Sequence, residues 1–291
     1  MVTVESAHGP LRLIDVYYAQ NLEDIDALKA NLSPNKIVYI RQAPITFDLQ
    51  QFAGWYRPFS TILLDLERDI EELFKEASST CRRQIRRIDR MPGHIAIGRN
   101  DPVVCSDFRK LYNGFVARSR HAEPLSRSRL DLLRPITDVF VAYFEGRPLC
   151  GHIFVRDQTI GRVGLLLSAS TRLEGEDPPG FVGAMNRWLH WYEVRLYKSE
   201  GMLQYDFGGA GTDTPREAGI AWFKQSFGGR QVLEHNYIAA GPVGRVAIAL
   251  FYAMRRIRSA RWTSGPGGRL TNSGWTDIRR AAAAKEHEKS P

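Results

Sequence analysis

Cysteine is scarce in this 291-residue sequence, and no apolar segment is long. Cys81, Cys105 and Cys150 lie far apart without the spacing of metal ligands, which argues for reduced thiols rather than a disulfide framework. The longest apolar runs, such as residues 246–254, are too short to span a bilayer. No charged segment followed by an apolar one opens the chain. We therefore expect a cytoplasmic protein.

The motifs of several common enzyme classes are also missing. The seven histidines are dispersed, without the HxxxH or HExxH spacing of a zinc site, so we expect no metal. The sequence contains no GxSxG elbow, no P-loop and no GxGxxG segment opening a helix. These absences argue against a serine hydrolase, an NTPase and a dinucleotide-binding enzyme.

The composition is that of a globular protein, with 43% hydrophobic and 25% charged residues. The net charge of +8 is concentrated in two places. Residues 251–291 hold nine Lys/Arg against three Asp/Glu, and residues 82–90 hold five arginines against one aspartate. Such clusters fit contact with the phosphates of a nucleotide, a nucleic acid or a membrane surface, although a solvated helix face has the same composition.

Hydrophobic periodicity and turn residues predict a mixed sheet with helices on both faces. A hairpin is expected at residues 139–156, turning at Glu145-Gly146-Arg147, and a strand–helix–strand crossover follows it. The expected strands are 11–18, 36–41, 61–66, 94–98, 139–144, 148–156, 159–170, 203–207 and 232–239. The expected helices are 22–32, 68–91, 101–120, 181–199, 218–227 and 245–261.

A carboxylate and two glycines end the predicted strand at Tyr205-Asp206-Phe207-Gly208-Gly209. Glycine there allows a sharp turn or the close approach of a ligand to the backbone. Asp206 could hold a substrate amine or orient a base, and it could equally cap a loop amide.

The segment Phe223-Lys224-Gln225-Ser226-Phe227-Gly228-Gly229 places a lysine among aromatic residues on a short helix that ends at glycine. Lys224 could neutralise a phosphate or a developing oxyanion. The alternative is a surface lysine whose aliphatic stem covers apolar neighbours. His152, in an otherwise apolar strand, could act as a base or be a satisfied core histidine.

Four segments in this order resemble the FemAB-like branch of the GNAT acyltransferase superfamily, in particular its BioF-type acetyltransferase domains. The arginine-rich helix is residues 81–90, and a strand with small residues after a hairpin is 148–152. A "yDfgG" strand end is 205–209, and a "gxxxFKxxFGg" segment is 219–229. The resemblance covers about residues 61–240.

The resemblance implies an α/β (α+β) GNAT fold, with a mixed, mostly antiparallel central sheet flanked by helices. The GNAT acyltransferase domain would be residues 76–242, and residues 1–75 would form a partial or degenerate GNAT-like half. Residues 243–262 are expected to form a basic amphipathic helix, and residues 263–291 a mobile tail.

The implied function is an N-acyltransferase, in the first place an N-acetyltransferase that uses acetyl-CoA or another acyl-CoA as co-substrate. The acceptor would be an amine, small or lipid- or nucleotide-linked, such as an amino sugar of cell-envelope or exopolysaccharide biosynthesis. The implied catalytic residues are Asp206, Lys224 and His152. The implied acceptor- or phosphate-binding residues are Arg82, Arg83, Arg86, Tyr205, Gly208 and Gly209.

In GNAT enzymes the acyl donor lies in a splay between two central strands. Here the strand 161–170 is the expected edge, and residues 177–183 stand where the pyrophosphate loop would be. That segment does not match the usual Gln/Arg-x-x-Gly-x-Gly/Ala pattern. The implied donor-binding residues are Leu166, Leu167, Ser168, Gly180 and Gly183.

Two alternatives stay open. The first is a FemAB-type transferase that takes aminoacyl-tRNA as donor, which a basic surface would also suit. The second is a non-catalytic scaffold at the inner face of the membrane, because apolar residues and arginines alternate around the expected helix 245–261.

Overall fold

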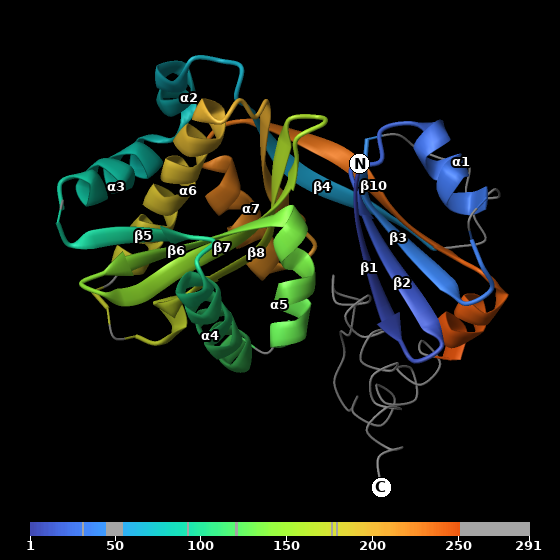
Figure 1. The fold of residues 1–291 in the computed structure, drawn as a ribbon. Helices are drawn as coiled ribbons and strands as arrows, with labels where there is room; N and C mark the ends of the chain where they lie inside the picture. Colours follow the sequence, from blue (N-terminus) through green and yellow to red (C-terminus); the bar gives the residue numbers. More distant parts are fainter. Residues whose placement is uncertain are drawn as a thin grey trace, which may run out of the picture. The chain divides into compact units, whose positions relative to one another are not determined.

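The computed structural model describes residues 1–30, 32–44, 55–91, 93–119, 122–175, 177–178 and 180–250 (Figure 1). The chain forms two compact units. Unit 1 comprises Met1–Pro58, His121–Glu123 and His235–Pro291, and unit 2 comprises Phe59–Arg120 and Pro124–Glu234. Strands β4 (Trp55–Asp65) and β10 (Arg230–Ala240) each pass from one unit into the other.

Unit 1 is a small sheet in the strand order β1-β2-β3-β10. Strand β2 pairs parallel with β3 through the crossover helix α1, whereas β1–β2 and β3–β10 are antiparallel. The first strand, β1, is absent from the sequence-based expectation, because its alternating polar residues leave little apolar signal. The bounds are β1 Val2–His8, β2 Leu11–Tyr17, α1 Leu22–Ala30 and β3 Lys36–Ala43.

Unit 2 holds the strand order β4-β9-β8-β7-β6-β5. All neighbouring strands pair antiparallel except β8 and β9, which are parallel. The bounds are β5 Ile95–Arg99, β6 Thr137–Phe144, β7 Arg147–Asp157, β8 Arg162–Ser170 and β9 Gln204–Gly209. The expected mixed, mostly antiparallel sheet is confirmed.

Helices cover both faces of the unit 2 sheet (Figure 1), which agrees with the nearly continuous burial along β6 and β7. Buried residues of α2, α3, α6 and α7 form one hydrophobic core with one face, and those of α4 and α5 form a second core with the other. The bounds are α2 Ile70–Glu76, α3 Ser79–Asp89, α4 Pro102–Ser119, α5 Arg127–Leu133, α6 Phe181–Ser199 and α7 Pro215–Gln225.

The continuous helix expected at residues 68–91 is wrong, because the structure divides it into α2 and α3. Ala77 and Ser78 adopt extended backbone between them, and the Ser78 hydroxyl accepts a hydrogen bond from the Cys81 amide at 3.2 Å. A serine N-cap of this kind starts a new helix. The apolar stripe continues across the break, so periodicity alone does not reveal it.

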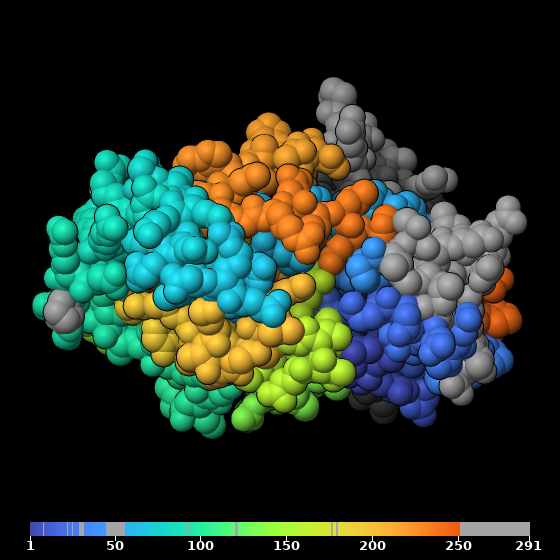
Figure 2. Space-filling view, turned by 90° about the horizontal axis from the view of Figure 1, so that it is seen from above, coloured from blue at the N-terminus to red at the C-terminus, as the bar shows by residue number. Residues whose placement is uncertain are grey.

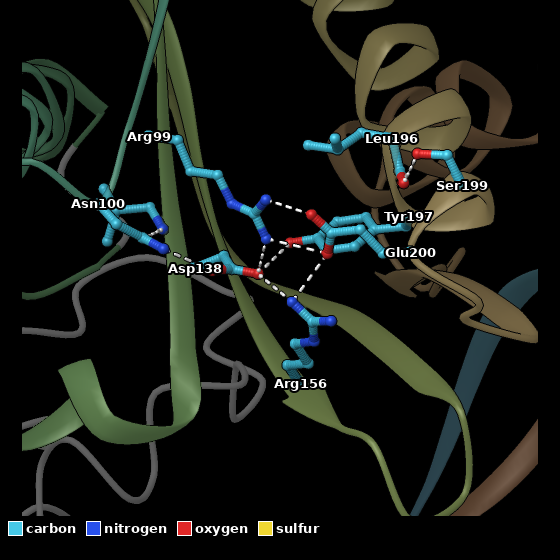
Figure 3. A network of polar contacts seen from close by, with 9 residues as sticks. Arg99, Asn100, Asp138, Arg156, Leu196, Tyr197, Ser199 and Glu200 are labelled. Carbon is cyan, nitrogen blue, oxygen red and sulfur yellow. Dashed lines mark hydrogen bonds and ion pairs between the residues drawn. The ribbon is translucent and has the colours of Figure 1, made fainter.

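A partly buried polar network fixes the C-terminal end of α6 against the sheet (Figure 3). Arg99 of β5 donates to Asp138 of β6 at 2.8 Å and also pairs with Glu200, which follows α6. Arg156 of β7 reaches Glu200 at 2.8 Å, and the Tyr197 hydroxyl donates to Asp138 at 3.1 Å. The network therefore sets where the inward-facing side chains of α6 meet the strands.

The expected basic helix 245–261 is described only in part. Residues 242–250 are helical, whereas 251–261 and the expected tail 263–291 lie outside the described residues. Among the described helices, none is long and apolar enough to cross a membrane. The assignment of residues 1–75 to a degenerate GNAT half stays a prediction.

Candidate active site

Strands β8 and β9 separate shortly after they pair. Their parallel pairing covers three residue pairs and ends at Gly164↔Asp206, while β8 stays paired with β7 as far as Ser170. Gly208 marks the point of separation, since its φ is +68° and a Cβ there would lie 2.6 Å from the Leu165 carbonyl oxygen. Beyond this point, no described residue pairs with the β8 edge on the side of β9.

Three of the predicted donor-binding residues lie on this edge. Leu166, Leu167 and Ser168 are partly exposed, and the two leucines pack against the α4 core. An unpaired strand edge offers backbone donors and acceptors to an extended ligand. The structure therefore places these residues where a donor could add to the sheet.

The other two predicted donor residues stand at the start of α6. Gly180 is the N-cap, with φ +77° and no side-chain cap, and Gly183 lies in the first turn. A Cβ at either position would meet nothing within 4 Å. The helix start is thus open at the surface, as an anion-binding helix N-terminus requires.

Lys224 is buried on α7, with 8% of its surface exposed. Its Nζ donates to the carbonyl of Gly209, the last residue of β9, at 2.7 Å. Burial lowers the pKa of Lys224 to about 8, and the nearby Asp206 opposes this shift. The alternative of a surface lysine is therefore wrong. A buried ammonium with a pKa near neutrality is typical of a functional site.

Asp206 is fully buried, and both of its carboxylate oxygens have partners. Oδ1 accepts from the Thr61 hydroxyl and from the Gly208 amide, the latter at 2.7 Å. Oδ2 accepts from Arg162 at 2.7 Å, and Arg162 also donates to Glu234 at 2.6 Å. These contacts hold the turn at the end of β9 in place. They agree with the alternative in which Asp206 caps a loop amide. A catalytic role for Asp206 stays a prediction.

His152 belongs to a buried hydrogen-bonded chain. Its Nδ1 lies 2.8 Å from Glu193, and its Nε2 lies 2.9 Å from the Asn186 side-chain oxygen. The Tyr205 hydroxyl donates to Glu193 at 2.9 Å and lies 2.7 Å from His190 Nδ1. The chain runs from partly exposed Asn186 into the core between α6 and the sheet.

The protonation of this chain follows from its burial. Burial lowers the pKa of His190 well below its ordinary value, and the neighbouring His152 acts in the same direction. Burial also raises the pKa of Glu193, although His152 and Tyr205 oppose it. The Tyr205 hydroxyl is thus already hydrogen-bonded to Glu193 and close to His190. The predicted contact between Tyr205 and an acceptor stays a prediction.

His152, His190 and Glu193 are also of metal-ligating type, and one ligand atom of each lies within 4.8 Å of the others. Each of these three side chains already has a hydrogen-bond partner in the series of buried side chains described above. Their spacing along the sequence, on β7 and α6, matches no metal motif, so sequence reasoning did not find the group.

The predicted phosphate-binding arginines lie on α3. They line an open hollow along the helix, and Figure 2 shows α2 and α3 (cyan to teal) at the surface beside α6 (gold). Arg82 donates to the Lys75 carbonyl at 2.6 Å, and the Arg86 guanidinium lies 5.2 Å from the centre of the Phe74 ring. The residues lining the hollow are Ser79, Arg82, Arg83, Arg86, Arg87 and Arg90.

The predicted site residues do not all lie together in the structure. The β8 edge, Gly208, Gly209 and Lys224 come together around the point where β8 and β9 separate. Asp206 lies beneath this point in a buried ion network, and His152 lies in the core under α6. Sequence reasoning missed Glu193, Arg162 and Glu234, because a charge buried by tertiary contacts leaves no local pattern.

No protein-family model matches this chain, and no curated protein matches it. Solved structures do resemble it. The structure of FemX is similar with a TM-score of 0.58 and 12% identity, over 85% of each chain. The C-terminal domain of a protein described as a lysylphosphatidylglycerol synthetase, from Agrobacterium fabrum, gives a TM-score of 0.52 and 14% identity, over 87% of this chain and 84% of that one.

A third structure, L-PGS from Bacillus licheniformis, gives a TM-score of 0.50 and 14% identity, over 81% of this chain and 80% of that one. At these identities the similarity shows the fold alone. The chain thus shares the fold of these structures, and the expected fold class, a mixed sheet flanked by helices, is confirmed.

Proposed function

We propose that this protein is an acyltransferase, and that the group it transfers is an aminoacyl group. The observation that carries the proposal is the separation of β8 from β9 beside the buried ammonium of Lys224. The free β8 edge can hold the extended part of an acyl donor by backbone hydrogen bonds. Lys224 can then stabilise the negative charge that develops on the acyl oxygen.

The chemistry of the proposed step is aminolysis of an ester. A neutral amine attacks the acyl carbonyl, the new C–N bond forms, and the C–O bond to the donor's ribose breaks. The proton released from the attacking nitrogen ends on the departing ribose oxygen, so the step needs no other reactant. Proximity and a fixed cation supply most of the acceleration in such a reaction.

Two features support aminoacyl-tRNA over coenzyme A as the donor. The segment before α6 lacks the usual pyrophosphate-loop pattern. Furthermore, the arginines of α3 form a row of cations, and no carboxylate of the described residues forms an ion pair with Arg83, Arg87 or Arg90, which suits a surface for RNA phosphates. The structure of FemX is similar over most of both chains, which agrees with the FemAB-type alternative that takes aminoacyl-tRNA as donor.

The acceptor in this proposal is an amine on a lipid-linked or cell-envelope precursor. The name of the Agrobacterium relative describes an enzyme that joins lysine to a phospholipid. Exposed Val243, Val246 and Leu250 on the helical residues 242–250 would suit peripheral contact with a membrane that carries such an acceptor.

The second candidate function is N-acetylation of an amino sugar by an acyl-CoA. It is favoured by the open start of α6 at Gly180 and Gly183, where a pyrophosphate could bind backbone amides. The third, a scaffold at the membrane surface, would use the same exposed apolar residues without turnover.

One assay separates these candidates. The purified protein is incubated with labelled aminoacyl-tRNA or labelled acetyl-CoA, each with amino sugars, nucleotide-linked amino sugars and phospholipid vesicles. Transfer from aminoacyl-tRNA that is abolished by ribonuclease supports the proposal. Transfer from acetyl-CoA alone overturns it in favour of acetylation, and vesicle binding with no transfer from either donor overturns it in favour of a scaffold.

A further inference from the structure

Arg187 is a buried cation without a buried anion. It lies on α6, and only 6% of its surface is exposed. Its Nε has no hydrogen-bond partner, and no carboxylate of the described residues forms an ion pair with it. Its polar neighbour is the Cys81 thiol. An arginine so far removed from water is costly unless an anion compensates it.

The two acidic side chains that the structure describes just before α6 pair with other arginines. Glu174 pairs with Arg118 at 3.0 Å, and Asp177 pairs with Arg147. A second cation, Arg172, is close enough to Arg187 to lower the pKa of Arg187 further after the larger effect of burial. Arg172 and Arg187 are thus near enough to repel each other, and no carboxylate of the described residues forms an ion pair with either of them.

Two aromatic rings of α7 lie near the Arg187 guanidinium. The Arg187 guanidinium lies 4.4 Å from the centre of the Phe223 ring and 5.9 Å from that of Trp222, both on α7. Trp222 is 65% exposed, which is unusual for the largest aromatic side chain. A ring that is backed by a guanidinium on one side and open to solvent offers a stacking surface for a planar group.

We infer that Arg187, Arg172 and Trp222 form a nucleotide subsite, in which the arginines bind a phosphate and Trp222 stacks on the base. An anion with an attached aromatic ring satisfies both features, whereas a phosphate alone leaves Trp222 unexplained. If the proposed function holds, this nucleotide is the 3′-terminal one of the donor RNA. Only this identification rests on the proposed function.

Calorimetric titration of the whole protein tests the subsite without any transfer reaction. The probes are adenosine 5′-monophosphate, adenosine and inorganic phosphate. We expect the monophosphate to bind most tightly. Arg187→Met should weaken the monophosphate at least tenfold and leave adenosine unchanged, because it removes only the charge-assisted contact. Trp222→Ala should weaken both the monophosphate and adenosine, because it removes the stacking surface.

Matched controls come from the same two helices. Arg195→Met removes an exposed arginine of α6, and Ile220→Ala removes an exposed apolar residue of α7, and both should leave the three affinities unchanged. Trp222 is exposed, so Trp222→Ala should keep the fold, which circular dichroism checks for every variant.

Three results of the nucleotide titrations would overturn the inference. They are equal binding of inorganic phosphate and the monophosphate, unchanged monophosphate affinity in Arg187→Met, and no monophosphate binding at millimolar concentration. Loss of anionic-vesicle binding in Arg187→Met without nucleotide binding would also overturn it, in favour of a lipid headgroup. Nucleotide binding without aminoacyl transfer would sustain the subsite and refute the proposed function, so the two failures are distinguishable.

Discussion

Replacing Lys224 with methionine should make this protein more stable at pH 7 and less active. Burial lowers the pKa of Lys224 from 10.5 to about 8. Each pKa unit corresponds to about 1.4 kcal/mol, so keeping this ammonium charged inside the fold costs about 3 kcal/mol. Methionine keeps much of the apolar stem and loses the hydrogen bond to Gly209, worth about 1 kcal/mol. The expected gain is about 2 kcal/mol.

The sign of the pH dependence follows from the direction of this shift. Between pH 8 and the ordinary lysine value, the unfolded chain binds a proton at Lys224 that the folded chain does not. The free energy of unfolding of the wild type should therefore rise with pH across this window. Because methionine does not titrate, the stability advantage of Lys224→Met should shrink to nothing near pH 10. Urea unfolding at several pH values measures both curves.

Activity should change in the opposite sense. At pH 7 most Lys224 side chains are ammonium ions, the form that stabilises an oxyanion, so turnover should fall as the pH rises through about 8. Lys224→Met should lower the rate of acyl transfer about 100- to 1,000-fold, the usual cost of one lost oxyanion donor. Transfer from labelled aminoacyl-tRNA, followed under single-turnover conditions, measures the rate.

Lys198→Met is the matched control. Lys198 also donates to backbone carbonyls, those of Leu66 and Arg68 at 2.6 and 2.7 Å, but it lies near the end of α6. This variant should lose about 1 kcal/mol of stability and keep its activity. If Lys224→Met and Lys198→Met behaved alike in both assays, Lys224 would be a structural lysine, and its role as an oxyanion donor would be refuted.

Three further substitutions test the surroundings of the site. Asp206→Asn should lower the free energy of unfolding by about 3 kcal/mol in urea, because it breaks the buried pair with Arg162; an unchanged midpoint would contradict this network. Asp138→Ala should cost a similar ~3 kcal/mol, because it removes the carboxylate that Arg99, Asn100 and Tyr197 share, and an unaffected melting temperature would contradict a stabilising role for the network in Figure 3. Gly208→Ala should cost about 2 kcal/mol and reduce transfer, because its φ of +68° and the nearby Leu165 carbonyl exclude a Cβ. Full activity in a stable Gly208→Ala protein would show that the strands can separate without this glycine.

The Asp206 prediction also revises what the sequence suggested. From the motif alone, Asp206 stands beside two glycines at a strand end, which is equally compatible with a substrate contact and with a loop cap. The structure gives each of its oxygens a partner, one of them on a strand 145 residues away in the chain. A change at Asp206 is therefore expected to affect folding, whatever its effect on turnover.

The sequence by itself determined the parts of this protein that depend on local chemistry. Alternating and helical periodicities predicted most strands and the full extent of α6, because burial on one face imposes a repeat on neighbouring residues. The order of the arginine helix, the hairpin and the two glycine-ended segments indicated a GNAT fold, which the structure confirms.

Only the tertiary structure decided how charge is distributed inside that fold. The partners of Lys224, His152 and Arg187 come from other elements, and nothing within a few residues of each predicts them. The pKa of Lys224 depends on how deeply α7 packs against β9. Arg187 likewise has no counterion among the described residues because Glu174 and Asp177, which precede α6, pair with Arg118 and Arg147 instead. Electrostatic energy depends on distances in space, which the sequence alone does not show.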